Sequence, residues 1–544
     1  MRVLVPEIAT HVMEGGEGKN QAVLSVDVHP SLPLLVSAGA GENRVIFWTI
    51  RTDAEDQHEW LSFACELTST TFESTVNIVR FSPCGTYLAC GDSNGMITLL
   101  SVREEGRTWL DAKEERVLRR VHLRGHTMDV QDFAWSPDSI HAASAGMDNL
   151  IIVWDAVACT EVQRLKEHTH YAQGVAWSPD GSYLASSSFD ETVRINNVSI
   201  KKKTVTIQES TVLKKPRLFA DEFKGPTFCR RLAFSPERWS GLLVVPGGLT
   251  RDGPEPLEAS KSGSEVPDAQ ILDKIGGESV ESKRPLTYAA HVFRFSSSGL
   301  ADNMPVATLT GHSSPSLVVR FHPRAFETVS DNGEGVEPYL DITSSTESKG
   351  RFVFAVASTS AIYLYDTQHP QPIAVTDKLH YASYTDAAWY ASESGSAMLI
   401  VSTRDGCFRM LKFASGELGS IMPVSRPVVE LQVAHSEARE LTKANVQSEL
   451  AMESAYLHQE QPIILQDGSS APNNPAEHAI VGDISSPIIL DENSSNSQSP
   501  KKQRLTSDVN SSVSGISSAS KPDAPSAKIT ILQPRRVKLD QVRT

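Results

Sequence analysis

Alternating hydrophobic and polar residues, interrupted by short turns, dominate the first 420 residues of the chain. The clearest stretch runs from Leu123 to Asp155. It alternates through VQDFAW, turns at SPD, continues through HAASAG, turns again at MDN and ends in IIVWD. A period of two residues is typical of β-strands with one buried face, and Asp, Asn and Pro favour tight turns. This stretch therefore predicts three neighbouring strands of one small sheet.

The same pattern recurs along the chain, which indicates an internally repeated fold. Each unit joins short apolar strands through turns rich in Ser, Pro, Asp and Gly. Seven units are recognisable: His29–Trp48, Val76–Val102, Leu123–Asp155, His168–Val198, Arg230–Phe295, Gly311–Asp366 and His380–Phe413. Seven is a common number of blades in WD-repeat propellers. The sequence therefore predicts an all-β fold, a seven-bladed WD40 β-propeller over residues 1–420, with its last hundred or so residues outside it.

Two further features concern the closure of the ring and its loops. The first segment, Arg2 to Val12, is predicted to supply the outer strand of the seventh blade, which would close the ring. Two polar insertions, at about residues 250–284 and 325–349, fall between strands, where a propeller tolerates loops.

Four residues of the clearest unit have the spacing of a buried hydrogen-bond network. His126 precedes the first strand, Ser144 lies on the second, Asp148 lies in the next turn, and Trp154 lies on the third strand. WD-repeat blades join Asp to His, His to Ser, and Ser to the indole N–H, because buried polar groups need partners. A His beside an Asp is also typical of a catalytic base or a metal ligand, but we interpret this set as a structural blade network.

The tail, residues 421–544, lacks the strand pattern and is rich in Ser, Asn, Pro and Gln, a composition that predicts a largely disordered segment. A helix is possible over residues 436–458. Lys501, Lys502 and Arg504 form a basic cluster, which we interpret as a nuclear import signal. Residues 528–542, KITILQPRRVKLDQV, join a β-prone start to two arginines, which suggests a docking motif.

Composition narrows the classes of function. The formal net charge of −15 argues against direct, sequence-specific DNA binding and is compatible with a basic partner such as a histone. The six cysteines form no C-x-x-C pair, so we expect no metal site and no cofactor. We find neither a signal peptide nor an apolar run long enough to cross a membrane, and no nucleotide-binding, hydrolase or metalloprotease motif. We therefore expect a non-enzymatic, intracellular protein that binds other proteins.

Three longer segments resemble a known family. They are Leu218–Pro236, with an acidic D-E before an F-x-R-R-L strand, His170–Asp190, and Arg351–Trp389. All three resemble the middle WD-repeat subunit of chromatin assembly factor 1, and the resemblance covers roughly residues 1–420 in order. It implies a nuclear subunit of a histone chaperone complex, which acts in replication-coupled nucleosome assembly.

The resemblance also implies partners. These are the large and small subunits of chromatin assembly factor 1, the histones H3–H4, and the chaperone anti-silencing factor 1. In that family a tail motif of two arginines and an aliphatic residue docks on anti-silencing factor 1. Arg535, Arg536 and Val537 match it, with Leu539 nearby, although the usual Thr-Pro-Leu continuation is absent.

Three alternatives stay open at this point. A substrate receptor of a cullin ubiquitin ligase often carries W-D-x-R, but Trp154-Asp155 is followed by Ala156-Val157. The related replication-independent WD-repeat chaperone carries a further large domain where we expect a disordered tail. An enzyme is the third alternative, for which no motif argues.

Overall fold

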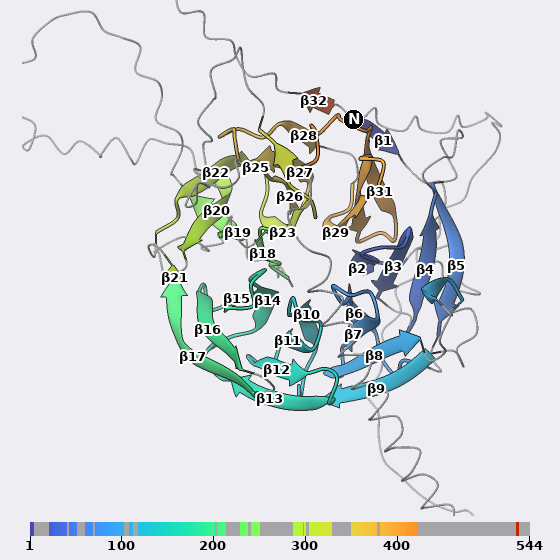
Figure 1. Ribbon diagram of the computed structural model, residues 1–544, viewed down its shortest axis with the longest axis vertical. Coiled ribbons are helices and arrows are strands. Elements are labelled where there is room, and N and C mark those ends of the chain that lie inside the picture. Colours follow the sequence, from blue (N-terminus) through green and yellow to red (C-terminus); the bar gives the residue numbers. More distant parts are fainter. Residues whose placement is uncertain are drawn as a thin grey trace, which may run out of the picture. The chain divides into compact units, whose positions relative to one another are not determined.

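The computed structural model is a β-propeller in which seven small sheets stand around a common axis (Figure 1). The residues that the structure describes are 1–4, 21–40, 43–51, 60–68, 71–102, 108–111, 118–201, 204–213, 229–237, 241–250, 287–296, 299–300, 304–328, 350–377, 381–422 and 529–531. The seven-bladed fold predicted from the repeats is confirmed. The possible helix at residues 436–458, the basic cluster at 501–504 and most of the docking motif lie outside the described residues.

Blades 1 to 4 are antiparallel four-stranded meanders that run from the axis outward. Blade 1 contains β2 (Val23–Val28), β3 (Leu34–Gly39), β4 (Val45–Ile50) and β5 (Leu61–Leu67), and blade 2 contains β6 (Val76–Phe81), β7 (Tyr87–Asp92), β8 (Met96–Val102) and β9 (Leu118–Arg124). Blade 3 contains β10 (Val130–Trp135), β11 (His141–Gly146), β12 (Ile151–Asp155) and β13 (Thr160–Leu165). Blade 4 contains β14 (Ala172–Trp177), β15 (Tyr183–Ser188), β16 (Val193–Lys201) and β17 (Thr204–Leu213). A 3₁₀ turn, η1 (Trp109–Asp111), lies between β8 and β9.

Blades 5 to 7 depart from this simple order. Blade 5 contains β18 (Ala233–Phe234), β19 (Leu242–Thr250) and β20 (Thr287–Ser296), and both β21 (Gly299–Leu300) and β22 (Ala307–His312) pair with β20. Blade 6 contains β23 (Ser316–Phe321), β26 (Val353–Ser358), β27 (Ala361–Asp366), β28 (Ala374–Asp377) and β32 (Ile529–Ile531). Blade 7 contains β29 (Tyr384–Ala391), β30 (Ala397–Thr403), β31 (Phe408–Phe413) and β1 (Arg2–Leu4).

The ring closes through β1, as the sequence predicted. β1 runs antiparallel to β31, with Val3 opposite Leu411, so the first residues of the chain complete the last blade. The described part of the predicted closing segment is Arg2–Leu4. Where we expected only a loop, at residues 325–349, two short strands lie at its ends. β24 (Phe326–Glu327) pairs with β25 (Gly350–Arg351). The rest of both insertions lies outside the described residues.

The hydrophobic core is divided among the seven junctions between neighbouring blades. In each of the seven clusters of buried apolar side chains, residues of one blade pack against residues of the next, blade 7 against blade 1 included. A strand such as β26, VFAVAS, is buried at every position because both of its faces meet another blade. Burying one such Phe or Val side chain stabilises the fold by about 1.5–3 kcal/mol.

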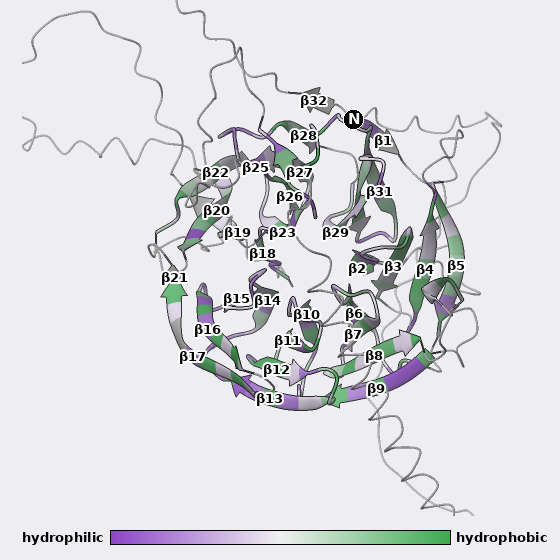
Figure 2. Cartoon of the chain, viewed as in Figure 1, coloured by the Kyte–Doolittle hydropathy of each residue, from purple (hydrophilic) through white to green (hydrophobic). Residues whose placement is uncertain are grey.

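The outer strands differ in composition from the inner ones. Figure 2 shows hydrophobic residues along the inner and middle strands, whereas β9 and β13 on the outside carry long hydrophilic stretches. Between strands, Asn149 (φ 67°) and Gly181 (φ 76°) adopt the left-handed conformation that tight turns require. No helix among the described residues is long and apolar enough to cross a membrane.

Candidate functional site

The structure brings together the four residues of blade 3 that the sequence singled out. His126 lies before β10, and its Nδ1 is 2.9 Å from Asp148 Oδ1 in the turn between β11 and β12. On the other side of the ring, Nε2 is 2.7 Å from Ser144 Oγ, and Trp154 Nε1 donates to the same oxygen at 2.8 Å. The four groups therefore form one continuous chain of hydrogen bonds across the buried side of the blade.

Asp148 is held in its charged form by this network. Burial alone would raise the pKa of Asp148, but the hydrogen bond and charge of His126, with the backbone N–H of Thr127, hold that pKa below its ordinary value. Every polar atom of the four side chains is used within the blade. The arrangement positions loops and strands and leaves His126 without an open side toward a substrate.

Other blades hold the equivalent histidine with different partners. In blade 4, His168 Nδ1 lies 3.0 Å from Asp190 and Nε2 lies 2.9 Å from Ser186. Asn196 stands on β16 where blade 3 has its tryptophan, and its Oδ1 is buried without a hydrogen-bond partner. In blade 6 the histidine is His312, whose two ring nitrogens meet hydroxyl groups.

A second group of charges, which sequence reasoning missed, lies on the propeller axis. Asp386 of β29 is buried and accepts from Arg80 Nη1 at 2.9 Å and from Arg231 Nη1 at 3.0 Å on one oxygen. Its other oxygen is 3.0 Å from Arg320 Nη2. Asp132 of β10 adds weaker contacts, 3.7 Å from Arg80 and 3.5 Å from Arg231. We call these five residues the axial charge cluster.

The axial charge cluster joins the innermost strands of all seven blades. Arg80, Asp132, Arg231, Arg320 and Asp386 come from blades 2, 3, 5, 6 and 7. Blade 1 contributes through the backbone N–H of Val26, which donates to Asp386 at 3.2 Å, and blade 4 through Val175, whose N–H donates to Asp132 at 3.0 Å. The cluster therefore connects the innermost strands of the blades by ion pairs and hydrogen bonds, in addition to the backbone bridge between Arg231 and Val318.

Burial by itself would raise the pKa of Asp386, but the positive charges of Arg231, Arg80 and Arg320 outweigh it and hold that pKa well below its ordinary range. The pKa of Asp27, which lies near the cluster on β2, is raised instead, because burial outweighs the charges of Arg80 and Arg320. The charge on Asp386 is thus an intrinsic part of the folded ring.

The sequence contained a signal for this cluster. Asp132, Arg231 and Asp386 each lie three residues before the aromatic residue near the end of the innermost strand, and Arg80 and Arg320 lie one residue before it. Both positions share one face of a strand. In blade 4 the first of these positions is Gly174, where a Cβ would clash with the carbonyl oxygen of Arg230. A search for charges at period two in the first strand of each unit would have found the set.

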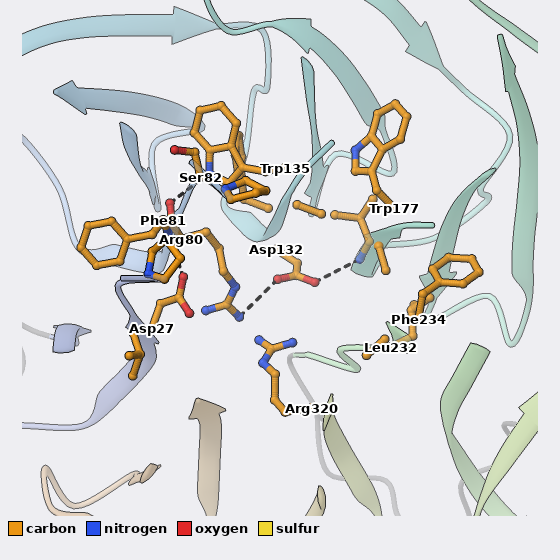
Figure 3. Close-up of a pocket in the computed structure, with 18 residues that line it drawn as sticks. Asp27, Arg80, Phe81, Ser82, Asp132, Trp135, Trp177, Leu232, Phe234 and Arg320 are labelled. Carbon is orange, nitrogen blue, oxygen red and sulfur yellow. Dashed lines mark hydrogen bonds and ion pairs between the residues drawn. The ribbon is translucent and has the colours of Figure 1, made fainter. Parts of the chain in front are cut away.

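A cavity of about 360 Å³ opens beside the axial charge cluster (Figure 3). Residues of blades 1 to 6 line it: Arg80, Asp132, Arg320 and Asp27 provide the charges, and Phe81, Trp135, Trp177 and Phe234 provide aromatic walls. Trp135 Nε1 donates to the carbonyl of Arg80 at 3.0 Å, which links two of these walls. Both signs of charge therefore lie side by side in the wall of the cavity. No group of three or more metal-ligating side chains occurs among the described residues.

Exposed aromatic residues gather at one end of blade 4. Tyr171, in the loop that enters β14, is 38% exposed, and Phe189, in the turn after β15, is 49% exposed. The ring of His170 lies 4.2 Å from the ring of Tyr171 and 4.7 Å from that of Phe189. In an antiparallel blade the loop before the first strand and the turn between the second and third lie at the same end. We call His170, Tyr171 and Phe189 the aromatic patch; exposed aromatic groups of this kind are enriched in protein interfaces.

The predicted site residues of the tail lie almost entirely outside the described residues. This holds for Lys501, Lys502 and Arg504, and for Arg535, Arg536, Val537 and Leu539. The described part is β32, whose three residues pair antiparallel with β28, with Thr530 opposite Val375. The sequence predicted a docking motif with a β-prone start over residues 528–542. In the structure this strand pairs with the chain's own propeller.

The comparisons with known proteins agree with this architecture. Residues 1–262 match the family described as the CAF1B/HIR1 beta-propeller domain. The chromatin assembly factor 1 subunit FAS2 homolog of Oryza sativa subsp. japonica is 30% identical over 422 residues, which cover 74% of this chain and 72% of the rice protein. A chromatin assembly factor 1 subunit of Mus musculus is 27% identical over 460 residues, which cover 79% of this chain and 70% of the mouse protein.

A further relative bears on one of the alternatives. Protein HIRA of Homo sapiens is 28% identical over 433 residues, which cover 77% of this chain but 36% of the human protein. The two chromatin assembly factor relatives, in contrast, are covered over most of their own length. The repeats, the closed ring of seven blades and this similarity lead to one conclusion, which the resemblance in sequence predicted: the chain belongs to the CAF1B/FAS2 family, the WD-repeat histone chaperone subunits of chromatin assembly factor 1.

Proposed function

We propose that the protein is a non-enzymatic scaffold of a nuclear histone chaperone complex, in which it joins a large and a small subunit and helps to deposit histones H3–H4 on newly replicated DNA. The observation that carries this proposal is the 30% identity to a chromatin assembly factor 1 subunit over most of both chains. The acidic net charge of −15 is consistent with a basic cargo, whose approach it would accelerate. The same charge disfavours direct, sequence-specific contact with DNA.

The aromatic patch supports a role in binding another protein. Tyr171 and Phe189 expose large rigid side chains that lose little conformational entropy on binding, and aromatic residues of this kind often dominate interface energies. We propose that the patch contacts another subunit of the complex. Its neighbours on the same end of the blade, Asp190 and Glu191, add negative charge around it.

Reconstitution tests the scaffold and the patch together. The full chain is mixed with the large subunit, the small subunit and H3–H4, and the complexes are separated by size. We expect one assembly that contains all components, and we expect Tyr171→Ala with Phe189→Ala to weaken it by roughly tenfold or more. Phe63→Ala is the matched control, because Phe63 is 56% exposed on the outer strand β5. Equal losses in both variants would contradict a specific role of the patch.

We further propose that the tail docks on anti-silencing factor 1. Arg535 and Arg536 would pair with carboxylates of that chaperone, because the planar guanidinium binds a carboxylate through two parallel hydrogen bonds. Val537 and Leu539 would occupy small apolar pockets beside this contact. Since ordering a flexible segment costs entropy, the isolated peptide should bind only modestly.

Calorimetry with a peptide covering Lys528 to Thr544 tests the docking. We expect the peptide to bind purified anti-silencing factor 1 and the double change Arg535→Ala with Arg536→Ala to abolish the heat. Val537→Asp should also weaken binding, although it leaves every basic residue in place. That variant separates docking from the alternative that Arg535 and Arg536 are the second half of an import signal, for which Val537 would be irrelevant. A double-arginine variant that binds as well as the original peptide would contradict the proposal.

Nuclear entry is proposed to depend on Lys501, Lys502 and Arg504. Replacing all three with Ala should leave a tagged full chain in the cytoplasm. The matched control replaces Arg535 and Arg536 with Ala, which should leave the protein in the nucleus. Nuclear accumulation of the triple variant would place the signal elsewhere or in a partner.

The similarity to HIRA supports a second candidate, a replication-independent histone chaperone. A pull-down of the full chain from nuclear extract distinguishes the two candidates by the co-purifying subunits. Recovery of the large and small subunits of chromatin assembly factor 1 supports the first proposal. Recovery of the subunits of a different histone chaperone complex in their place supports the second candidate, and recovery of a cullin ligase adaptor would favour the receptor alternative.

A further inference from the structure

Blade 6 differs from the other blades at its outer edge. Its outermost meander strand, β28, is covered by a fifth strand, β32, whereas no further strand covers the outermost strands of the other blades among the described residues. β32 comes from the tail, far along the chain from the propeller. Three register pairs define the contact: Ala374 with Ile531, Val375 with Thr530, and Thr376 with Ile529. The edge of blade 6 therefore already has an occupant in this structure.

The sequences of both strands suit this pairing. The added strand reads Ile-Thr-Ile, three β-branched residues in a row, which favour the extended conformation. The receiving strand reads Ala-Val-Thr-Asp and has no charge before its exposed last residue, Asp377. The outer strands β9 and β13, in contrast, carry Arg and Glu side chains, which discourage the addition of another strand. Blade 6 thus presents a short, uncharged edge to a β-prone segment of its own chain.

We propose that the edge of β28 is a strand-addition site for the tail segment Ile529–Ile531, and that this intramolecular pairing competes with binding of the partner chaperone by the same tail. The second half of this inference rests on the proposed docking function. A β-strand has two hydrogen-bonding edges, so β32 keeps one edge open when it pairs with β28. The three residues are nevertheless fixed against blade 6, and they cannot adopt a different position on another protein at the same time.

The short stretch of chain between Ile531 and Arg535 adds a steric contribution to the competition. Arg535 follows Ile531 by four residues, and four extended residues span at most about 14 Å. Pairing of β32 with β28 would therefore limit how far a chaperone bound to Arg535 and Arg536 could stand from blade 6. Such a chaperone would have to fit against the edge of blade 6 or displace β32.

The expected strength of the competition is modest. The pairing involves only three residues. A long stretch of chain connects them to the propeller, and the effective concentration of Ile529–Ile531 at blade 6 decreases as this connection becomes longer. The apparent affinity for a partner falls by the fraction of chains whose tail is released. For a released fraction between about a half and a tenth, the full chain would bind the partner roughly two- to tenfold more weakly than the isolated tail peptide.

An engineered disulfide tests the pairing itself. Val375→Cys with Thr530→Cys places two thiols on register partners of β28 and β32. The matched control is Val375→Cys with Thr506→Cys, which puts the second thiol elsewhere on the same tail, and Thr530→Cys alone controls for reaction with native cysteines. We expect oxidation of the dilute full chain to close the register pair at least about tenfold faster than the control pair. Equal rates would overturn the strand-addition site.

Affinities for anti-silencing factor 1 then test the competition. The oxidised register pair should bind at least about tenfold more weakly than the same protein after reduction with dithiothreitol, and the control pair should not change. A second test compares full chain and peptide, each with Thr530→Pro, which removes a backbone N–H and weakens β32. The ratio of their dissociation constants should fall to about one, because any direct effect on docking is common to both. Thr530→Val, which keeps the N–H, should leave the ratio at its original value.

The outcomes separate the two proposals. If the register pair closes fast but oxidation leaves binding unchanged, the competition is wrong. If no peptide binds the chaperone at all, the proposed docking function fails and the competition fails with it, while fast closure still supports the strand-addition site. If the ratio stays above one in Thr530→Pro, the weaker binding of the full chain has another cause and the competition is overturned.

Discussion

Blade 3 and blade 6 anchor a histidine at the same place in the repeat, but they do so with different chemistry. In blade 3, His126 is held between a carboxylate, Asp148, and a hydroxyl, Ser144. In blade 6, His312 Nδ1 lies 2.7 Å from Ser316 Oγ and Nε2 lies 2.8 Å from the Tyr365 hydroxyl. In blade 6, therefore, both ring nitrogens of the histidine are hydrogen-bonded to neutral side chains.

The different hydrogen-bond partners of His126 and His312 give the two blades different charges and pKa values. Without a carboxylate, burial dominates at His312 and lowers its pKa to about 3, with His291 nearby adding to the effect. In blade 3 the buried carboxylate stays charged, and the pKa of Asp148 is lowered despite its burial. Both blades hydrogen-bond the two ring nitrogens of their buried histidine. The residue that bonds the histidine, a carboxylate or a hydroxyl group, decides whether the core of the blade carries a negative charge. The two blades should therefore respond differently to mutation and to pH.

The largest expected effect concerns what the two blades share. Asp386 accepts from Arg320 of blade 6 and is linked through Arg80 and Arg231 to Asp132 of blade 3. Asp386→Asn leaves buried arginines without their main counter-charge, which should cost about 3–5 kcal/mol of the free energy of unfolding. Urea denaturation measures this loss, and Glu393→Gln, an exposed carboxylate on blade 7, is the control.

Hydrogen exchange of the Asp386→Asn protein sharpens the comparison. Because the axial charge cluster is common to all blades, β11 of blade 3 and β26 of blade 6 should lose protection alike. Loss of protection in one blade alone would mean that the cluster acts locally and not on the ring.

The second largest expected effect concerns the carboxylate of Asp148, which has no counterpart in blade 6. Asp148→Ala removes the partner of His126 and of the Thr127 N–H and leaves buried groups without hydrogen bonds, which should cost about 1–3 kcal/mol. Urea melts of both proteins measure the effect, with Asp377→Ala, exposed at the end of β28, as the control. An unchanged midpoint would mean that the network does not stabilise the blade.

The pH dependence separates the two blades directly. The folded-state pKa of His312, about 3, lies below its ordinary value of 6.5, so below pH 6.5 the unfolded state takes up a proton that the folded state refuses. Stability from this group is therefore complete above pH 6.5 and decreases as the pH falls toward 3. At pH 5 the loss should be about 2 kcal/mol. Between pH 6.5 and pH 5 Asp148 adds no dependence, because its pKa is held below the ordinary value of 3.8 and its contribution is lost only as the pH falls below that value.

Urea melts at pH 7 and pH 5 test this difference. Other buried histidines also contribute to the slope, so the comparison is with His312→Gln, which keeps hydrogen-bonding groups but cannot titrate. We expect the variant to lose less stability than the original protein between the two pH values. Identical losses would show that His312 does not drive the acid sensitivity.

The smallest expected effect is at the Tyr365 hydroxyl, which bonds Nε2 of the blade 6 histidine as the Ser144 hydroxyl does in blade 3. Tyr365→Phe keeps the buried ring but removes the partner of His312 Nε2, which should cost about 0.5–1.5 kcal/mol. The control is Tyr381→Phe, because Tyr381 is 89% exposed. A larger loss than that of Asp148→Ala would reverse the ranking of the two networks.

Prediction from the sequence was strongest where the signal is local. The turns after the first strands, the alternation of the inner strands and the spacing of His126, Ser144, Asp148 and Trp154 all lie within about 30 residues. The outer strands were harder to place, because β13, TEVQRL, meets solvent on its outer side and lacks a strong hydrophobic pattern. The histidine network of blade 6 was also missed, since Ser316 and Tyr365 do not match the usual residue types.

By itself the sequence determined the repeat number, the all-β class and the family, because each depends on residues that are near one another or on similarity along the chain. It also placed a closing strand within Arg2 to Val12, of which Arg2–Leu4 is described, because a ring of blades needs its open sheet edge covered. Tertiary structure alone decided that Arg80, Arg231, Arg320, Asp132 and Asp386 meet on one axis, and that Ile529–Ile531 pairs with β28. These contacts join residues up to hundreds of positions apart. Their energy depends on distance and burial in three dimensions, which ring closure sets. A local pattern can place charged residues on the innermost strands, but it does not say which of them meet.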